Sequence, residues 1–205
     1  YGDIALVYRS TTGIDRYEDP LREADIPYLV EGGKLYYTRQ EVRDLASAVW
    51  VVEDTYDSVA LLAVLRSPIF GFSDEEIFLF TRAGGRLCYL DPGKPGMGFE
   101  DFLASFELLS TLHGERNTAG PAATLGRLLA RTGYLSSSKL RAHGEQRILN
   151  LRKAVQTARL FEEKGRSFRY YARWMRDQDT LGAAEGESPA VDEGENAGRM
   201  ITIHK

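Results

Sequence analysis

The sequence PYLVEGGKLYYTRQEVRD, residues 27–44, is the most informative part of the chain because two kinds of structure meet within it. Residues 28–30 form a short apolar run behind a proline, which is typical of a β-strand. Two glycines at 32–33 follow, and the aromatic pair at 36–37 then leads into a charged segment with helical spacing. We therefore expect this stretch to connect a strand-containing part of the chain to a helical part.

On the N-terminal side, the pattern predicts a strand at residues 4–8, then polar residues and a turn at Gly13. A short helix is expected from about Asp15, with a start near Pro20 as the alternative. Strand, helix and strand within about thirty residues form a βαβ unit, whose parallel strands are buried only as part of a larger sheet. A β-branched run at 199–203 predicts that the chain returns to a strand near its end.

Between these strands the sequence is helical in pattern. Val42, Leu45, Val49 and Val52 recur at helical spacing, and Ser73 with Glu76 fits a capping box at the start of a later helix. Asp57 or Ser58 is expected to cap the helix before it. The remaining helices are expected at 99–112, from Pro121 to Gly133, at 146–161 and after Ser167.

The composition is that of an ordinary globular chain. The 205 residues are 43% hydrophobic, and the single cysteine, Cys88, cannot form an internal disulfide. No stretch reaches the ~20 apolar residues of a membrane helix, so we expect a reduced, cytoplasmic setting without membrane contact. The chain starts at Tyr1 with neither an initiator methionine nor a signal-peptide pattern, so we expect it to be part of a longer protein.

Charge is unevenly distributed along the chain. Residues 139–176 contain eleven Lys and Arg against three Glu, a formal charge of +8, although the whole chain carries −4. Residues 177–198 contain seven acidic residues and no basic one, in a composition that predicts a flexible linker. The basic span indicates either a surface for a polyanion such as DNA or simply solvated helix faces.

Several motifs together carry a family resemblance. They are DIALVYRS (3–10), LREADIPY (21–28), GG (32–33), YY (36–37), RQEVRD (39–44), LRSPIFGFSDEE (65–76) and ITIHK (201–205). In this order they resemble the C-terminal motor region of UvrD/Rep-like superfamily 1 DNA helicases. The motifs at 65–76 and 201–205 resemble the helicase-nuclease branch, AddA- or RecB-like, more than UvrD itself.

The resemblance implies a mostly α fold, with a bundle-like helical subdomain inserted into an incomplete RecA-like α/β domain of the P-loop NTPase type. Residues 1–35 and 199–205 would belong to the second RecA-like motor domain, and 36–198 to the inserted subdomain. The parent would be an ATP-dependent enzyme using ATP and Mg²⁺, moving 3′ to 5′ on DNA in repair or recombination. This sequence contains no Gly-x-x-x-x-Gly-Lys-Ser/Thr loop and no acidic pair after an apolar strand, so we expect no ATPase site within it.

The resemblance also implies DNA-contacting residues at the start of the chain. Arg9 and Thr11 follow the first strand, where open α/β sheets bind ligands; a plain surface arginine is the alternative for Arg9. Lys34, Tyr36 and Arg39 lie at the junction, where aromatic rings can stack on bases and cations can pair with phosphates. For Tyr36 and its neighbour Tyr37, packing at a hinge is the alternative.

Two further sites follow from the resemblance. Gly71 and Ser73 lie in a turn before a helix, where relatives contact duplex phosphates; a simple capped turn is the alternative, and the acidic residues after Ser73 oppose phosphate. Thr202 and His204 match a segment that couples the nucleotide site to DNA, with a frayed chain end as the alternative. His113 and His143 lack metal-ligand spacing, so no metal site is expected.

Two functions therefore stay open. The helical part is either a DNA-engaging regulatory subdomain of a helicase, contacting single-stranded and duplex DNA and swivelling on the rest of the helicase chain, or a protein-interaction module that docks a partner subunit. The third, less favoured alternative is a stand-alone helical protein. Salt dependence of DNA binding distinguishes the first two.

Overall fold

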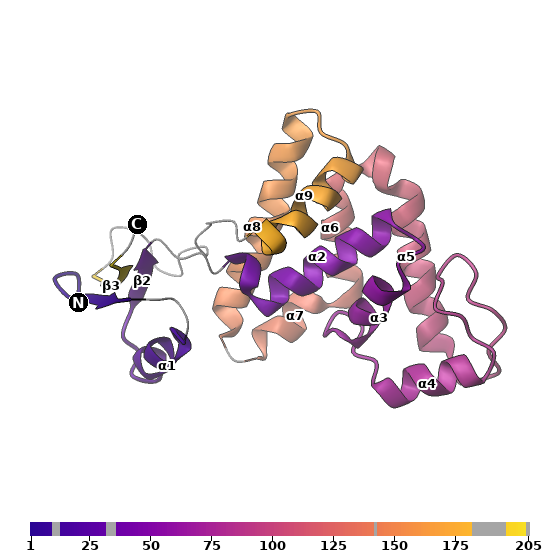
Figure 1. Ribbon diagram of the computed structural model, residues 1–205, viewed down its shortest axis with the longest axis horizontal. Helices are drawn as coiled ribbons and strands as arrows, with labels where there is room; N and C mark the ends of the chain where they lie inside the picture. Colours follow the sequence, from indigo (N-terminus) through magenta and orange to yellow (C-terminus); the bar gives the residue numbers. More distant parts are fainter. Residues whose placement is uncertain (10–12, 32–35, 142, 182–195, 204–205) are drawn as a thin grey trace.

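The structure, a computed structural model, describes residues 1–9, 13–31, 36–141, 143–181 and 196–203. These residues are mostly helical, which confirms the predicted fold class at that level. Figure 1 shows a small sheet with one helix at one end of the molecule and a larger helical body beside it. The elements are β1 (Ala5–Tyr8), α1 (Asp15–Glu23), β2 (Tyr28–Glu31), the 3₁₀ turn η1 (Tyr36–Thr38), α2 (Gln40–Glu53), α3 (Ser58–Arg66), α4 (Asp74–Arg82), α5 (Glu100–Ala119), α6 (Pro121–Thr132), α7 (Tyr134–Lys139), α8 (Gly144–Glu163), α9 (Phe168–Leu181) and β3 (Gly198–Thr202).

The sheet is parallel, and its middle strand comes last in the sequence. The strand order is β1-β3-β2, with Tyr8 opposite Thr202 on one side of β3 and Tyr28 opposite Gly198 on the other. The predicted return to a strand is confirmed, and the alternative of a frayed end is wrong for residues 198–202, because β3 is hydrogen-bonded along both edges. A second small core of Tyr8, Ile14 and Met200, against which Leu21 of α1 packs, holds α1 on this sheet.

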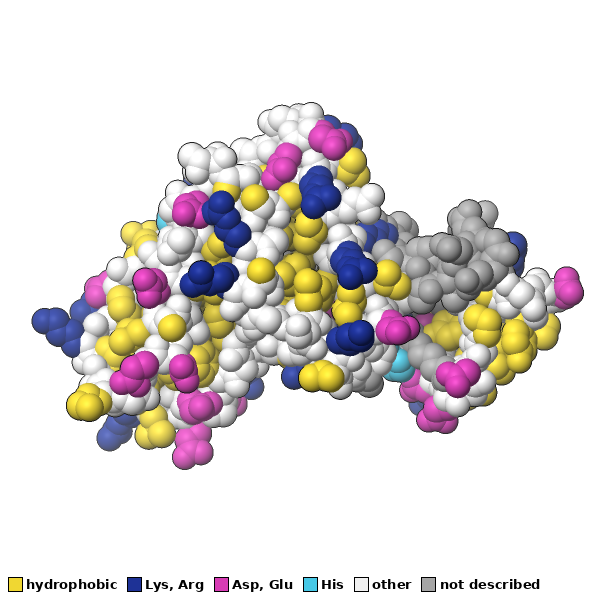
Figure 2. Space-filling model, turned by 180° about the vertical axis from the view of Figure 1, so that it is seen from behind, with side chains coloured by type: hydrophobic (Ala, Val, Ile, Leu, Met, Phe, Trp, Pro, Cys, Tyr) yellow, Lys and Arg dark blue, Asp and Glu magenta, His cyan; other side chains and the backbone are white. Residues whose placement is uncertain are grey.

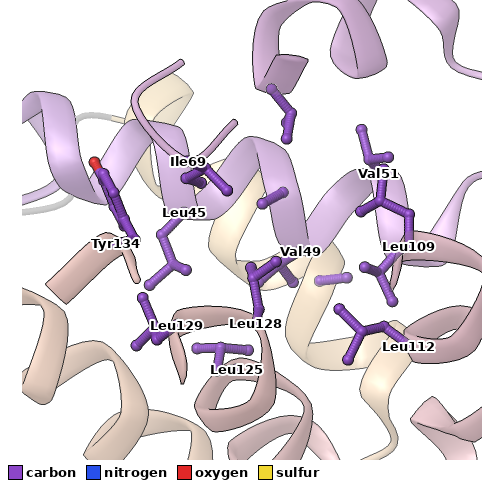
Figure 3. Close-up of a cluster of buried hydrophobic side chains, with 14 of the residues drawn as sticks. Leu45, Val49, Val51, Ile69, Leu109, Leu112, Leu125, Leu128, Leu129 and Tyr134 are labelled. Carbon is purple, nitrogen blue, oxygen red and sulfur yellow. The ribbon is translucent and has the colours of Figure 1, made fainter. Parts of the chain in front are cut away.

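The core of the helical body is built around α2. The predicted stripe of Val42, Leu45, Val49 and Val52 is buried, and so is Val51 on another side of the helix. A helix that is apolar on several sides belongs in the centre of a bundle, and α2 contacts α3, α5, α8 and α9. Figure 3 shows its leucine and valine side chains facing leucines that include Leu109, Leu112, Leu125, Leu128 and Leu129.

Some predicted helix boundaries were wrong. The first helix begins at Asp15 and holds Pro20 in its interior, so the alternative start near Pro20 is excluded. The helix expected at 99–112 extends to Ala119. Its last turns are polar and show no apolar periodicity, so the sequence did not predict them as helical. The six-residue helix α7 was missed, since its serine-rich sequence is too short to show periodicity.

The structure corrects the predicted linker, residues 177–198, at both of its ends. Helix α9 continues to Leu181, where Gln178 Nε2 donates to the Trp174 carbonyl at 3.0 Å. At the other end, the Asn196 Oδ1 atom accepts hydrogen bonds from the Tyr1 ammonium (2.5 Å) and the Gly2 N–H (2.6 Å). Both ends of the predicted linker are therefore ordered parts of the fold, and residues 182–195 lie outside the described residues.

Candidate nucleic-acid interface

The carboxyl ends of the three strands lie at one edge of the sheet, which is where several site residues were predicted. Arg9 follows β1 with an exposed side chain, and the Ile203 N–H donates to the Tyr8 carbonyl at 3.0 Å, so Arg9 lies next to the end of β3. The structure therefore brings Arg9 close to residue 202 of the predicted coupling segment. Thr11, Lys34 and His204 lie outside the described residues, and their predicted roles remain predictions.

Tyr36 is buried inside the helical body. Its side chain is only 1% exposed, its hydroxyl donates to the Asn150 carbonyl at 3.2 Å, and the Lys153 ammonium lies 4.6 Å from its ring centre. Tyr37 packs edge-on against it with 4.8 Å between ring centres. In this conformation neither face of the Tyr36 ring is accessible, which fits the packing alternative. Stacking of a base on Tyr36 remains a prediction.

Arg39 pairs with a buried carboxylate across the junction. Its guanidinium lies 3.0 Å from Glu18 Oε2 in α1, and the Glu18 side chain is 1% exposed. Tyr28 donates its hydroxyl to the other oxygen of the same carboxylate at 3.3 Å. An arginine that left this pair for a phosphate would leave a buried charge uncompensated, which is costly. In this conformation Arg39 therefore connects the sheet to the start of α2.

The rest of the RQEVRD motif forms a buried polar network at the start of α2. Asn150 Nδ2 donates to Glu41 Oε1 at 2.8 Å, and Arg147 lies 3.2 Å from Glu41 Oε2. The Tyr134 hydroxyl donates to Asp44 at 3.0 Å. Burial raises the pKa of Asp44, and its hydrogen bonds oppose that shift. Sequence reasoning assigned these residues to a family motif, but their partners lie in α7 and α8 and were not predictable from the motif.

Gly71 and Ser73 lie in an exposed turn between α3 and α4, remote from the sheet edge (Figure 1). Gly71 has φ +77°, in the left-handed region that favours glycine, and a Cβ there would meet no atom within 4 Å. The predicted capping box is present: the Glu76 N–H donates to Ser73 Oγ at 3.2 Å, and the Ser73 N–H donates back to the Glu76 carboxylate at 2.7 Å. This geometry fits the capped-turn alternative, and a duplex contact here remains a prediction.

Replacing Ser73 by alanine is expected to destabilise the protein by about 1 kcal/mol, because an N-cap side chain satisfies a helix N–H that alanine leaves unpaired. Thermal or urea unfolding followed by circular dichroism measures the change. Ser105→Ala is the matched control: its hydroxyl donates to the Asp101 carbonyl within α5, so a change of less than about 0.5 kcal/mol is expected. Equal losses in the two variants would contradict the capping role.

The basic span covers α8 and α9, and only part of it is free for a ligand. Arg147 and Arg169 are paired with Glu41 and Glu53, and Arg176 lies over the Trp50 ring. Within the described residues, six cations of the span have exposed side chains and neither an ion pair nor a ring contact: Lys139, Arg141, Arg152, Arg159, Lys164 and Arg173. These six are the cations that a polyanion could reach without breaking an internal contact.

Lys and Arg side chains are dispersed over the face of the molecule drawn in Figure 2. Figure 2 shows Lys and Arg side chains spaced among apolar and uncharged ones, whereas acidic side chains gather at the end of the body that holds α4. Asp74, Glu75 and Glu76 in the first turn of α4 are all exposed. The exposed cations of α8 and α9 thus contrast in charge with the acidic first turn of α4.

The sequence has no phosphate-binding loop, and in the described part of the chain no group of three or more His, Cys, Asp or Glu could hold a metal ion. In the same described residues, no helix is long and apolar enough to cross a membrane.

Comparison with known proteins places the chain beside one group of relatives. It is 30% identical over 217 residues to the AddA subunit of the ATP-dependent helicase/nuclease of Thermoanaerobacter pseudethanolicus, in an alignment covering 100% of this chain and 17% of the relative. The same-named proteins of Heliobacterium modesticaldum and Listeria innocua are 28% and 26% identical, again over 100% of this chain and over 16% and 17% of their own lengths. No family model matches the chain.

These matches confirm the resemblance to the UvrD/Rep-like helicases that the motifs indicated. The chain is therefore similar over its whole length to helicase/nuclease subunits A, the branch that the motifs at 65–76 and 201–205 indicated. The chain spans about a sixth of the length of these relatives.

Proposed function

We propose that this chain is the part of a DNA helicase-nuclease in which a helical subdomain is inserted into the second RecA-like motor domain. The observation that carries the proposal is the position of β3 between β1 and β2. All of α2 to α9 lies between β2 and β3 in the sequence, so the helical body interrupts one parallel sheet. We assign residues 1–35 and the strand at 198–202 to the motor domain and the helices between them to the insert.

We extend the proposal to the activity of the whole protein, on the basis of what its relatives are named as. They are named as one subunit of an ATP-dependent helicase/nuclease, and this chain would serve such an enzyme, which uses ATP and Mg²⁺ and moves 3′ to 5′ on DNA in repair or recombination. Because the relatives are named as a subunit, an assembly with a further subunit is also favoured. The sequence has no phosphate-binding loop, and we assign to this chain a structural and DNA-engaging contribution.

Within that enzyme, the exposed cations of α8 and α9 would contact DNA phosphates. Arg152 and Arg159 are seven residues apart, two helical turns, and therefore lie on the same side of α8 about 10 Å from each other. Both are exposed and lack an ion pair within the described residues. The contacts would be sequence-independent, as expected for an enzyme that travels along DNA.

A salt titration of DNA binding tests the proposal. The logarithm of the binding constant is expected to fall linearly with the logarithm of salt concentration, and the variant with Arg152→Glu and Arg159→Glu is expected to reduce the slope by about 0.7–0.9 for each phosphate that is no longer bound. Fluorescence anisotropy of labelled single-stranded and duplex oligonucleotides measures both effects. Arg131→Glu, an exposed position on α6, is the matched control. No binding at low salt, or equal slopes in the two variants, would favour the docking role instead.

A further inference from the structure

The connection between α8 and α9 is a short turn in the helical body, away from the sheet, and hydrogen bonds hold it on both sides (Figure 1). On the α8 side, Gly165 has φ +65° and the Arg166 N–H donates to the Phe161 carbonyl at 2.9 Å, which is the bond of a Schellman motif. On the α9 side, Ser167 Oγ accepts from the Tyr170 N–H at 3.3 Å. These bonds give the first turn of α9, and with it Tyr170, a defined position.

A row of aromatic rings connects this turn to the junction motif. The ring centres of Tyr37 and Trp174 are 6.0 Å apart, and those of Trp174 and Phe161 are 4.7 Å apart. The Phe161 ring in turn lies 5.9 Å from that of Tyr170. Exposure rises along the row, from 4% at Tyr37 through the partly buried Trp174 and Phe161 to 47% at Tyr170. Tyr170 is therefore the ring of this row that is most open to a ligand.

Cations surround the exposed ring. The Arg166 guanidinium lies 4.7 Å from the Tyr170 ring centre, and Lys164 and Arg173 are exposed and have no ion pair within the described residues. Arg173 follows Tyr170 by three residues and therefore lies on the same side of α9. Guanidinium groups also stack on bases, so Arg166 extends the stacking surface of Tyr170, which is 47% exposed with Arg166 in place.

Three carboxylates lie near the turn, and each has a place away from the ring. Glu162 Oε1 accepts from a backbone N–H at the start of α6 at 2.7 Å. Glu163 follows Phe161 by two residues, about 200° around α8, so it lies on the other side of that helix. Asp177 is seven residues beyond Tyr170, about 10 Å along α9. The charge in contact with the ring is therefore positive.

We propose that the turn between α8 and α9 holds a base of single-stranded nucleic acid on the Tyr170 ring, with neighbouring phosphates on Lys164 and Arg173. Aromatic rings among cations hold single strands in this way without reading their sequence. The bases of a duplex are stacked on one another, so the site favours a single strand. The inference rests on the proposed DNA-binding function, to which it adds a base contact and a preference for single strands.

Two oligonucleotides of equal length and charge test the stacking: oligo-dT and a strand in which abasic sites replace the bases. The 205-residue chain is expected to bind oligo-dT about five-fold or more tightly than the abasic strand, which is the effect of one stacked base. In Tyr170→Ala this preference is expected to vanish, whereas Tyr170→Phe keeps the ring and is expected to retain it. Fluorescence anisotropy at low salt measures the binding constants.

Tyr56→Ala is the matched control, because it removes an 89% exposed tyrosine from the connection between α2 and α3 and is expected to leave the preference unchanged. The salt dependence of Tyr170→Ala is expected to equal that of the unaltered chain, since a stacked base releases no counterions. Equal binding of the two strands by the unaltered chain, or a preference that survives Tyr170→Ala, would overturn the stacking site and leave the proposed phosphate contacts standing. Binding of neither strand at low salt would overturn the DNA-binding function itself, and this inference with it.

Discussion

Replacing Phe80 by alanine is expected to lower the free energy of unfolding by about 3–5 kcal/mol, the range for removing a fully buried aromatic ring. Phe80 is 0% exposed and anchors α4 to α5. Its ring stacks on Phe102 with 4.6 Å between centres and meets Phe106 edge-on at 5.7 Å. Urea unfolding monitored by circular dichroism measures the change.

Phe78→Ala is the matched control for Phe80. It removes the same side chain from the same helix at a position that is 57% exposed, where the ring contacts Arg82 with 5.8 Å from the guanidinium to the ring centre. A loss of less than about 1 kcal/mol is expected. Equal losses of stability in the two variants would contradict the claim that the burial of Phe80 holds α4 on α5.

The sequence predicted helices and strands more accurately than contacts between distant residues, for a physical reason. The helix α2 was predicted because burying one side of a helix imposes a spacing of three and four residues, and Leu45 and Val49 obey it. The α4 capping box was predicted because both partners lie within one turn. Boundaries failed where no such local signal exists, as in the polar end of α5 or the short helix α7.

The residues of the candidate site differ in the same way: local pattern predicts some positions, and distant contacts determine others. Arg9 could be placed at the sheet edge from the strand pattern alone, because parallel strands end together. Tyr36 could not be placed, since its burial depends on Asn150, 114 residues away. An aromatic residue at a junction has the same local sequence whether it faces a base or a core, and only the distant partner distinguishes the two.

A distant partner also decides which function can be assigned to Arg39, because this arginine pairs with Glu18. A family motif rich in Arg and Glu invites an assignment to ligand binding, but here Arg39 connects α1 to the helical body through a buried carboxylate. The His143 Nε2 and Asp19 Oδ1 atoms, 3.1 Å apart, form a second contact between the same two parts. Arg39 of the motif therefore holds the helical body against α1, and the exposed cations that we propose to contact DNA lie elsewhere, on α8 and α9.

Replacing Glu41 by alanine is expected to destabilise the protein by about 3 kcal/mol, because it breaks a buried polar network. The side chain is 3% exposed, and its carboxylate binds Arg147 and the fully buried Asn150. Removing one member of a buried ion pair leaves the other without compensation, and the amide of Asn150 also loses its acceptor. Glu41→Gln retains an acceptor for Asn150 and is expected to lose less.

Glu115→Ala is the control for Glu41, because it removes a carboxylate from an exposed pair with Arg127 and is expected to cost less than about 1 kcal/mol. Urea unfolding of the three variants gives the ranking. If Glu41→Ala were as stable as Glu115→Ala, the start of α2 would not hold α8 in place. The positions of Arg152 and Arg159 on α8 would then lack the support that their proposed contact with DNA requires, so a stability measurement on Glu41 also tests the geometry of the DNA surface.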